Sequence, residues 1–317
     1  MKLIIIIPAY NEEKTIGSVI RGIPENIFGI SEKEIIVIDD GSTDNTAKLS
    51  QEAGARVVSH PENKGLGAAF STGIKEALSK KADLMVNIDA DGQFDARDIP
   101  RLIQPILNEE ADLAIGSRFM RGSSAIKIPK IKLLGNKIMA IFISRICGKR
   151  LYDVSCGFRA YSKEALLHLN LFGGFTYTQE AILNLSFKNL KITEIPIGVR
   201  YFSEKKSFIS GNLLNYILKT MKIIFRTILD YRPLRFLGGF GIFLFSLGLV
   251  LDILMLCIFL QIGQFTPYKF IGISGLSFNL LGLVFFTIGL MADILNRIRQ
   301  TQERTLYYQK KKFYYGG

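Results

Sequence analysis

Two long apolar stretches near the C-terminus constrain the fold of this chain more than any other feature. Residues 236–262 contain a single charged residue, Asp252, and residues 271–290 contain none. A helix needs roughly 20 apolar residues to cross about 30 Å of hydrocarbon, and each stretch reaches that length. The segment between them, around "GQFTPYK", has room only for a tight turn. The sequence therefore predicts a transmembrane hairpin within 236–296, with helices at about 236–262 and 271–295.

The charge of the chain is divided unevenly along its length. The net charge is +12, but residues 1–120 hold 13 Lys and Arg against 19 Asp and Glu, while residues 121–317 hold 27 against 9. The basic half is also the apolar half, and the mean hydropathy of the whole chain is +0.24. No zinc-finger, RNP or homeodomain-like pattern accompanies the positive charge. We therefore expect a lipid bilayer with an anionic surface as the partner, and no nucleic acid.

The basic residues around the predicted hairpin indicate its orientation. The turn between the helices carries only Lys269, whereas cations flank both outer ends: Lys219, Lys222, Arg226, Arg232 and Arg235 before the pair, and Arg297, Arg299, Arg304 and Lys310 to Lys312 after it. Because cytoplasmic segments are enriched in Lys and Arg, both termini and the domain before the hairpin are predicted to be cytoplasmic. Residues 297–317 would form a basic tail that binds anionic lipid.

Two further segments have the pattern of helices that lie flat in the headgroup region. Residues 212–229, within a juxtamembrane segment 208–235, have apolar residues at helical spacing with Lys219, Lys222 and Arg226 on another face. Residues 131–146 show a weaker version of the same pattern. Interfacial helices are amphipathic in this way, and core helices of a soluble domain remain the alternative for both segments.

The N-terminal part of the chain alternates short β-branched runs with helical stretches. The runs at 3–8, 34–39, 55–60, 84–89 and 112–117 read as strands, and the stretches at 12–23, 42–54 and 65–78 read as helices. This alternation predicts an α/β domain with a mostly parallel, Rossmann-like sheet, whose ligands bind at the carboxyl ends of the strands. Neither a G-x-G-x-x-G after the first strand nor a Walker loop is present, so another kind of nucleotide site is needed.

Acidic residues follow the predicted strands at this edge. Glu12 follows the first strand, Asp39 ends the second, and Asp89 and Asp91 form a D-x-D after the fourth. Two carboxylates one residue apart can both bind a hard divalent cation such as Mg²⁺ or Mn²⁺, and Gln93 can add a neutral oxygen. The three cysteines suit neither a disulfide framework nor a zinc site, so an all-oxygen metal site is expected.

Three motifs in order carry a specific resemblance: P-A-Y-N-E at 8–12, D-D-G-S-T-D at 39–44 and D-A-D-G-Q at 89–93. With them the chain resembles the inverting, GT-A-fold glycosyltransferases of family 2, over residues 1 to about 210, which sets a catalytic domain at 1–207. The resemblance implies one group of residues for the base and ribose of a nucleotide sugar, and a second group for its diphosphate and the metal. The first group is Pro8, Tyr10, Glu12, Val37 and Asp39, and the second is Asp89, Ala90, Asp91 and Gln93.

Later motifs resemble the polyprenyl-phosphate hexosyltransferases, which include dolichyl-phosphate mannose synthase. They are "GSRF", "DVSCGFRAYSK", "TYTQEAILN" and "VRYFSEKKS", at 116–119, 153–163, 176–184 and 199–207. The resemblance implies that Arg118, Arg200 and Lys206 contact the donor diphosphate, and that Lys132, Arg200 and Lys206 contact the acceptor phosphate. The family more often has arginine where Lys132 stands. Fixed positive charge is needed there, because an anionic acceptor must approach an anionic donor.

The expected reaction is a metal-dependent, inverting transfer of a hexose from a nucleotide sugar to polyprenyl (dolichyl) phosphate at the cytoplasmic membrane face. GDP-mannose is favoured by its frequency in the family, and a UDP-hexose, either UDP-glucose or UDP-N-acetylglucosamine, is the alternative. Because phosphate is already ionised near neutral pH, no strong general base is needed. Glu180 is therefore either the counterpart of the base of other members or a residue that orients an acceptor-binding cation. Asp91, Arg118, Arg200 and Glu180 are the predicted catalytic residues.

Three other functions are weighed against this one. A processive polysaccharide synthase resembles its relatives in a Q-x-x-R-W motif, but this chain has no tryptophan. A catalytically inactive membrane scaffold is disfavoured by the intact metal and phosphate residues. A soluble sugar nucleotidyltransferase would need a glycine-rich, lysine-containing first loop, which is missing.

A few residues are left with open or unremarkable interpretations. Asp252 either faces a partner or extends to the interface, as acids in spanning helices do. His60 and His168 are expected to be surface or packing residues, and Cys156 a small packed side chain. Small residues at the start of the hairpin permit close helix packing, within the hairpin or in a homo-oligomer: Gly238, Gly239 and Gly241.

Overall fold

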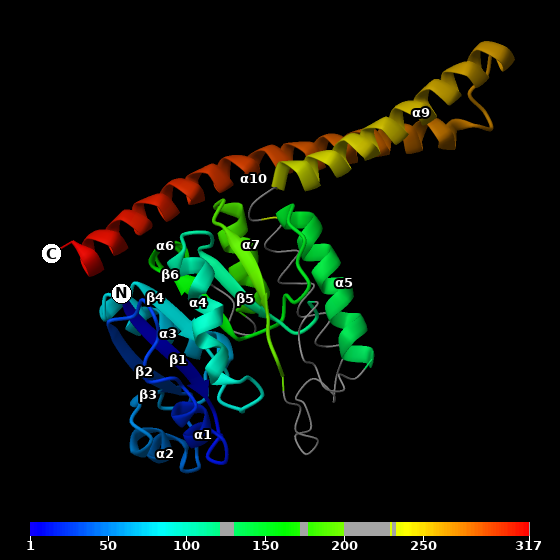
Figure 1. Cartoon of the computed structure of the whole chain (residues 1–317). Helices are drawn as coiled ribbons and strands as arrows, with labels where there is room; N and C mark the ends of the chain where they lie inside the picture. The colour runs from blue at the N-terminus through cyan, green and yellow to red at the C-terminus, as the bar shows by residue number, and fades with distance from the viewer. Residues whose placement is uncertain (121–129, 172–176, 200–228, 230–232, 317) are drawn as a thin grey trace. The chain divides into compact units, whose positions relative to one another are not determined.

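The computed structural model describes residues 1–120, 130–171, 177–199, 229 and 233–316. The chain divides into two compact units (Figure 1). Met1–Thr220 together with Leu306–Gly317 form the first unit, and Met221–Thr305 form the second. The predicted α/β domain lies in the first unit, and the predicted hairpin lies in the second.

The first unit is built on a seven-stranded sheet with the strand order β3-β2-β1-β4-β6-β5-β7. The strands are β1 (Lys2–Ala9), β2 (Glu32–Asp39), β3 (Arg56–Ser59), β4 (Leu84–Asn87), β5 (Leu113–Ser117), β6 (Arg159–Ser162) and β7 (Ile192–Pro196). Strand β6 runs antiparallel to its neighbours β4 and β5, and the other described pairs are parallel. The predicted, mostly parallel α/β sheet is confirmed.

The interior strand β1 shows why the sheet could be recognised in the sequence. Residues 3–7 are fully buried, and β1 pairs with β2 on one side and β4 on the other. A parallel strand covered on both faces has to be apolar at every position. By contrast, β6 ("RAYS") and β7 ("ITEIP") are short and mix polar with apolar residues, and no strand was predicted at either.

Helices pack on the sheet and shape the edge where the strands end. The described helices of this unit are α1 (Ile16–Arg21), α2 (Thr46–Glu52), α3 (Leu66–Ser79), α4 (Ile99–Leu107), α5 (Lys130–Cys147), α6 (Lys163–His168) and α7 (Thr178–Phe187), with a 3₁₀ turn η1 (Ala96–Asp98) before α4. Helix α3 lies against β1 and β2. A Cβ atom at Gly73 of α3 would lie 2.5 Å from Ile6 Cγ2, so glycine permits this close approach.

Helix α5 corresponds to the segment predicted to be interfacial at 131–146. It buries Ala140 and Ile143, while other apolar side chains remain exposed: Leu133, Ile138, Ile141 and Phe142. The helix therefore combines a packed face with an exposed apolar face, and its place in the membrane interface stays a prediction. The other interfacial prediction, at 212–229, lies outside the described residues except for Leu229.

The C-terminal residues differ from the sequence prediction of one basic tail over 297–317. Leu306–Gly317 belong to the first unit. The Lys310 ammonium donates to the Leu169 carbonyl at 2.9 Å and to Asn170 Oδ1 at 2.8 Å. The Tyr315 hydroxyl donates to the Ala82 carbonyl at 2.5 Å, and the Lys163 ammonium lies 3.6 Å from the centre of the Tyr315 ring. These side chains have partners in the α/β unit, so this part of the tail is packed.

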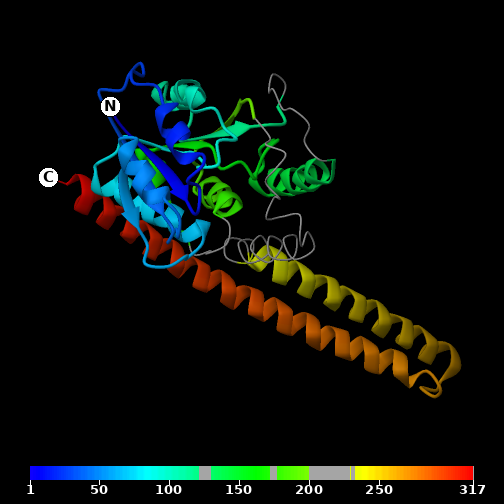
Figure 2. The same cartoon turned by 90° about the horizontal axis from the view of Figure 1, so that it is seen from below.

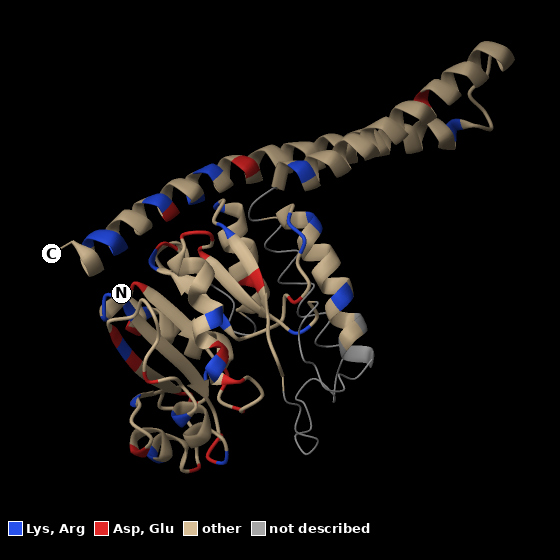
Figure 3. Ribbon diagram, viewed as in Figure 1, with Lys and Arg blue, Asp and Glu red and all other residues tan. Residues whose placement is uncertain are grey.

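The second unit contains the predicted hairpin (Figures 1 and 2). A π-helical turn, η2 (Leu234–Gly238), leads into α9 (Gly239–Ile262), and α10 spans Lys269–Tyr315. Leu234–Ile262 and Lys269–Tyr315 are both long and apolar enough to be candidate membrane spans. Helix α10 continues past the predicted limit at 295, and residues 296–315 contain no glycine or proline that would end it. Figure 3 shows few charged residues on the paired helices and many along the C-terminal part of α10.

Glycines bring the two apolar helices into close contact. A Cβ atom at Gly241 of α9 would lie 2.7 Å from the Gly282 carbonyl of α10, and one at Gly282 would lie 2.7 Å from the Gly241 carbonyl. Gly275, Gly282 and Gly289 recur every seven residues, as a packed helix face requires. The Asn279 amide donates to Asp252 Oδ2 at 2.5 Å, so Asp252 faces a partner on α10.

Candidate active site at the carboxyl edge of the sheet

Three acidic loops leave the sheet side by side. The adjacent strands β2, β1 and β4 are parallel, so the loops after Asp39, Ala9 and Asn87 start from the same edge. Two of these loops are hydrogen-bonded together: Thr43 N donates to Asn11 Oδ1 at 2.9 Å, and Glu12 N donates to Thr46 Oγ1 at 2.8 Å. The predicted meeting of the acidic strand ends is therefore found in the structure.

Asp89 carries the most perturbed carboxyl group of this edge. Its side chain keeps limited solvent access but lies deep among protein atoms. Burial, followed by the negative charge of Asp91, raises the pKa of Asp89 from 3.8 to about 7, against the opposing effects of Arg118 and Arg159. A buried carboxylate is costly unless a cation accompanies it. The fold thus places a negative charge where the described side chains compensate it only partly.

The D-x-D pair suits a divalent cation that also binds phosphate. Asp89 and Asp91 can provide two carboxylate ligands, and Asp91 Oδ1 accepts the Gln93 backbone N–H at 3.0 Å, which fixes the turn. Within the described ranges no group of three or more His, Cys, Asp or Glu side chains is arranged to hold a metal. Mg²⁺ and Mn²⁺ would therefore take their remaining ligands from a diphosphate and water, with Gln93 as a further candidate. The donor set fits such an ion.

The loop 153–158 supports Asp89 from behind. A Cβ atom at Gly157 would lie 2.6 Å from Asp89 Oδ1 and 2.7 Å from Oδ2, so only glycine leaves room for the carboxylate. The Gly157 carbonyl accepts the Asn87 side-chain amide at 2.8 Å, and the same amide donates to the Tyr177 hydroxyl at 2.8 Å. Tyr177 stacks on Phe70 with ring centres 3.8 Å apart. A rigid, buried layer therefore lies under the D-x-D.

The buried side chain of Arg159, which lies on strand β6 of the sheet, holds the loop 153–158 in place. Arg159 in β6 has no exposed surface, and its guanidinium donates to three backbone carbonyls, those of Cys156, Thr178 and Val154, at 2.7, 2.7 and 3.2 Å. Its charge also acts on Asp89. These carbonyls satisfy hydrogen-bond donors of the guanidinium, as a buried cation requires. Cys156 is fully buried, as expected for a packed side chain.

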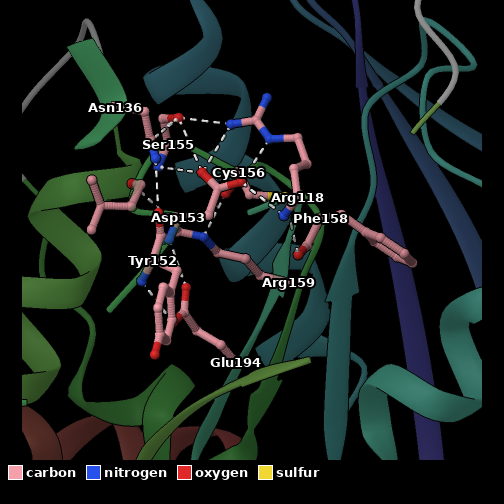
Figure 4. Close-up of polar contacts among 10 residues, drawn as sticks. Arg118, Asn136, Tyr152, Asp153, Ser155, Cys156, Phe158, Arg159 and Glu194 are labelled. Atoms are coloured by element: carbon pink, nitrogen blue, oxygen red, sulfur yellow. Dashed lines mark hydrogen bonds and ion pairs between the residues drawn. The ribbon is translucent and has the colours of Figure 1, made fainter. Parts of the chain in front are cut away.

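Arg118 follows β5 and is held by an ion pair. Its Nε and Nη2 donate to the two carboxylate oxygens of Asp153 at 2.6 and 2.9 Å, and Nη2 also donates to Ser155 Oγ at 2.7 Å (Figure 4). Asp153 is fully buried, whereas the Arg118 side chain is 15% exposed. Its charge also acts on Asp89, so this cation lies close to the D-x-D.

Asp39 and Asp40 have different roles at the end of β2. Asp39 Oδ1 accepts the Ser42 N–H at 3.1 Å within the predicted nucleotide loop. Asp40 accepts the N–H groups of Lys64 and Gly65 at 3.0 and 2.8 Å, next to the start of α3, and lies 2.7 Å from His60 Nδ1. His60 is thus a packing residue, as expected, and Asp40 anchors the loop before α3.

The remaining predicted residues fall into three groups. Near the sheet edge, Pro8 is buried at the end of β1, Tyr10 is 45% exposed and Ala90 is buried. Val37 has no exposed surface, and its side chain belongs to the sheet core, so any contact with a base would come from its backbone. Glu180 lies in the first turn of α7, directly after the Tyr177 layer. The Lys132 side chain, Arg200 and Lys206 lie outside the described residues.

Several supporting residues were not predicted as site residues: Asn87, Asp153, Gly157 and Arg159. Asn87 lies in the predicted strand at 84–89, and the other three lie in the quoted motif "DVSCGFRAYSK", but no spacing rule links them. Asn87 and Gly157 are 70 residues apart, and only the pairing of β4 with β6 brings them together. The one available signal was Gly157 itself, because a glycine directly before two bulky residues, Phe158 and Arg159, can mark a place where another group approaches the backbone closely.

Comparison with known proteins agrees with this geometry. The family described as Glycosyl transferase family 2 matches residues 4–169, more than half of the chain. The UDP-N-acetylglucosamine–dolichyl-phosphate N-acetylglucosaminyltransferase of Methanococcus voltae is 34% identical over 217 residues, which cover 62% of this chain and 85% of the relative. The dolichol-phosphate mannosyltransferase of Pyrococcus furiosus is 34% identical over 217 residues, covering 65% of this chain and 59% of the relative.

A solved structure shares the fold of the first unit. Glucosyl-3-phosphoglycerate synthase from Mycobacterium tuberculosis, crystallised with Mn²⁺, UDP-glucose and phosphoglyceric acid, aligns with a TM-score of 0.55 and 25% identity, over 69% of this chain and 78% of that one. The matched family region includes the three acidic strand ends and their D-x-D. The chain belongs to glycosyl transferase family 2.

Proposed function

We propose that this protein transfers a sugar from a nucleotide sugar to a polyprenyl phosphate, with a divalent cation and with inversion at the anomeric carbon. One observation carries the proposal: the same chain places Asp89 and Asp91 at the carboxyl edge of a GT-A sheet and ends in two candidate membrane spans. A nucleotide-sugar site joined to membrane-length helices suits an acceptor that is a lipid. The relatives from M. voltae and P. furiosus are named for such acceptors.

The site residues divide by the part of the donor that they would contact. Pro8, Tyr10, Glu12 and Asp39, with the Val37 backbone, would contact the base and ribose, because they lie at the carboxyl ends of β1 and β2 or in the loop that follows β1. Asp89, Asp91 and Gln93 would hold the cation, with the Ala90 backbone beside the diphosphate. Arg118 would contact the diphosphate, together with Arg200 and Lys206, while Lys132, Arg200 and Lys206 would contact the acceptor phosphate.

The reaction exchanges one bond at the anomeric carbon for another. An oxygen of the lipid phosphate forms a bond to that carbon, while the bond from the carbon to the nucleotide diphosphate breaks. A bound divalent cation supplies charge stabilisation to the departing diphosphate. Arg118 adds fixed positive charge on the same side. Because the acceptor oxygen is already ionised, the site needs to orient it rather than deprotonate it, and Glu180 would act by orienting a nearby cation.

Three donors are carried forward to experiment: GDP-mannose, UDP-N-acetylglucosamine and UDP-glucose. GDP-mannose is the first choice by its frequency among similar enzymes, and UDP-N-acetylglucosamine is the second. The two relatives named above are equally similar to this chain, at 34% identity, and one is named for mannose and the other for N-acetylglucosamine. Base selection would come from backbone contacts near the end of β2, so side-chain identities do not rank the donors.

The proposed location is the cytoplasmic face of the membrane. Lys269 is the single cation in the turn between the predicted helices 236–262 and 271–295, whereas Arg235 precedes the pair and several cations follow it along α10. The bias of Lys and Arg toward cytoplasmic segments therefore supports cytoplasmic termini and a cytoplasmic active site. A lipid-linked sugar made on that face is a donor for glycosylation on the opposite face.

The decisive experiment is a donor panel with the full chain. Purified protein in nanodiscs containing a polyprenyl phosphate is incubated with MnCl₂ and radiolabelled GDP-mannose, UDP-glucose or UDP-N-acetylglucosamine, and the lipid-extractable label is counted. We expect label from one donor, and its loss with EDTA or in Asp91→Ala. Asp95→Asn is the matched control, because Asp95 caps η1 in the same loop and asparagine is also a good cap. No label from any donor, in conditions where a related enzyme works, would refute the lipid acceptor.

A further inference from the structure

A polar chain connects helix α5 to Arg118. Asn136 lies on α5, and its side-chain oxygen accepts the Ser155 hydroxyl at 3.1 Å. Ser155 Oγ in turn accepts Arg118 Nη2 at 2.7 Å (Figure 4). The Asn136 amide also donates to the Tyr152 carbonyl at 2.8 Å, so α5 is tied to the loop 152–155 at two points. None of these contacts was predicted from the sequence.

The carboxylate partner of Arg118 is itself held rigidly. The Asp153 backbone N–H donates to Glu194 Oε1 at 2.7 Å, and the Tyr152 N–H donates to Glu194 Oε2 at 2.8 Å. Asp153 Oδ2 also accepts the Arg118 backbone N–H at 3.2 Å. The β7 residue Glu194 therefore fixes the loop, and the loop presents Asp153 to both the backbone and the side chain of Arg118.

Three directed contacts determine the plane of the guanidinium. Two come from Asp153 and one from Ser155, and they use Nε and Nη2. Arginine has several rotatable bonds, so holding its fork in one orientation before a ligand binds removes an entropic cost from binding. A site that must meet a diphosphate in one geometry benefits from this preorganisation, since small displacements of charged groups are costly.

We infer that Ser155 and Asn136 are positioning residues, which orient the Arg118 guanidinium toward the diphosphate of the nucleotide-sugar donor. Asp153 holds the cation, and the Asn136–Ser155 pair sets its rotation. The inference rests on the proposed function, in which Arg118 contacts the donor diphosphate. Residues that only stabilised the loop 152–155 would make the same contacts. The test therefore has to separate an effect on the orientation of the Arg118 guanidinium from an effect on the stability of the fold.

The test compares variants that keep or remove the Ser155 hydroxyl. Ser155→Ala loses the contact to Arg118, whereas Ser155→Thr retains a hydroxyl at the same carbon. We expect Ser155→Ala to weaken binding of UDP or GDP in MnCl₂ about tenfold, as for a lost hydrogen bond to a charged group, and to lower kcat/KM for the donor by a similar factor. Ser155→Thr should recover most of both. Asn136→Ala should weaken nucleotide binding and lower kcat/KM less than Ser155→Ala does and more than Ser155→Thr does, because Asn136 acts on Arg118 through Ser155.

A double-variant cycle assigns the effect to Arg118. In an Arg118→Ala background, Ser155→Ala should cause no further loss of nucleotide binding, because its target is absent. Asn108→Ala is the control: it removes a side-chain amide that bonds Gln104 on the exposed side of α4, and it should leave nucleotide binding unchanged. Thermal unfolding of every variant is measured alongside.

The outcomes separate this inference from the proposed function. If the effects of Ser155→Ala and Arg118→Ala on nucleotide binding multiply, or if Ser155→Ala lowers only the unfolding temperature, the positioning role is wrong. If the wild type binds UDP or GDP and shows the predicted cycle but transfers no sugar to lipid, the lipid acceptor is wrong and the positioning role stands. Binding of the nucleotide diphosphate is thus the readout that does not depend on turnover.

Discussion

Gly157 offers the sharpest test of the metal site, because one added methyl group would displace a specific carboxylate. A Cβ atom at this position would lie 2.6 Å from Asp89 Oδ1, 2.7 Å from Oδ2 and 3.0 Å from Cγ, whereas ordinary contacts begin at 3.4 Å. Gly157→Ala therefore requires Asp89 or the loop to move by about 0.8 Å. The backbone at Gly157 does not need a left-handed conformation, so alanine brings no further strain of its own.

The size of the effect follows from the displacement. Overpacking of this kind costs about 1–3 kcal/mol of the free energy of unfolding, which is less than the roughly 5–15 kcal/mol by which native domains are stable. A misplacement of about 1 Å in a catalytic constellation can cost about 100-fold in rate, and site residues need to be held within about 0.5 Å. We therefore expect kcat/KM to fall about 100-fold, with Mn²⁺-dependent nucleotide binding weakened, while the protein stays folded.

The assay pairs sugar transfer with thermal unfolding and Mn²⁺-dependent binding of UDP or GDP. Gly73→Ala is the steric control, since its Cβ would lie 2.5 Å from Ile6 Cγ2 in the core, and it should lower stability with nucleotide binding retained. Gly135→Ala on α5 is the neutral control, because no atom lies within 4 Å of its Cβ. If Gly157→Ala binds nucleotide and metal like the wild type, Asp89 is not the ligand that the geometry indicates.

Three other predictions address the loop, the hairpin and the C-terminus. Burial raises the pKa of Glu194 above 4.5, so its contribution to stability is complete below pH 4.5 and is lost as the pH rises through the raised pKa. The unfolding temperature should therefore fall with rising pH between about pH 4 and 7, and Glu194→Gln should make that fall smaller. Gly248→Leu places a side chain against Asn279 and should lower the aggregation temperature of the solubilised protein. Leu254 is exposed, so Leu254→Ala should leave that temperature unchanged. Equal aggregation temperatures for the two variants would contradict the packed hairpin. Tyr315→Phe keeps the ring but loses a hydrogen bond worth about 1 kcal/mol, so hydrogen exchange over 306–316 should quicken, and unchanged exchange would argue against docking of this segment.

The sequence alone determined the parts of this protein that depend on local pattern. Five strands, three helices and both membrane-length helices could be located from periodicity and length, since a buried parallel strand such as β1 is apolar throughout and a spanning helix is apolar for about 20 residues. The acidic residues at strand ends could be assigned to one edge, because parallel strands bring their carboxyl ends together. The D-x-D and its neighbouring motifs then pointed to the family.

Tertiary structure decided the contacts that join distant segments. The insertion of the short antiparallel strand β6 beside β4 places Gly157 against Asp89 and carries Arg159 into the core. Strand β6 ("RAYS") mixes polar with apolar residues, so no apolar run reveals it in the sequence. The pairing of Arg118 with Asp153, 35 residues later, depends on the β5–β6 register and on the loop that follows α5. Local propensity acts within a few residues, whereas these partners are selected by strand order and packing. The acidic residues of the site can therefore be recognised in the sequence, whereas the buried residues that hold them in place are brought together only in the folded chain.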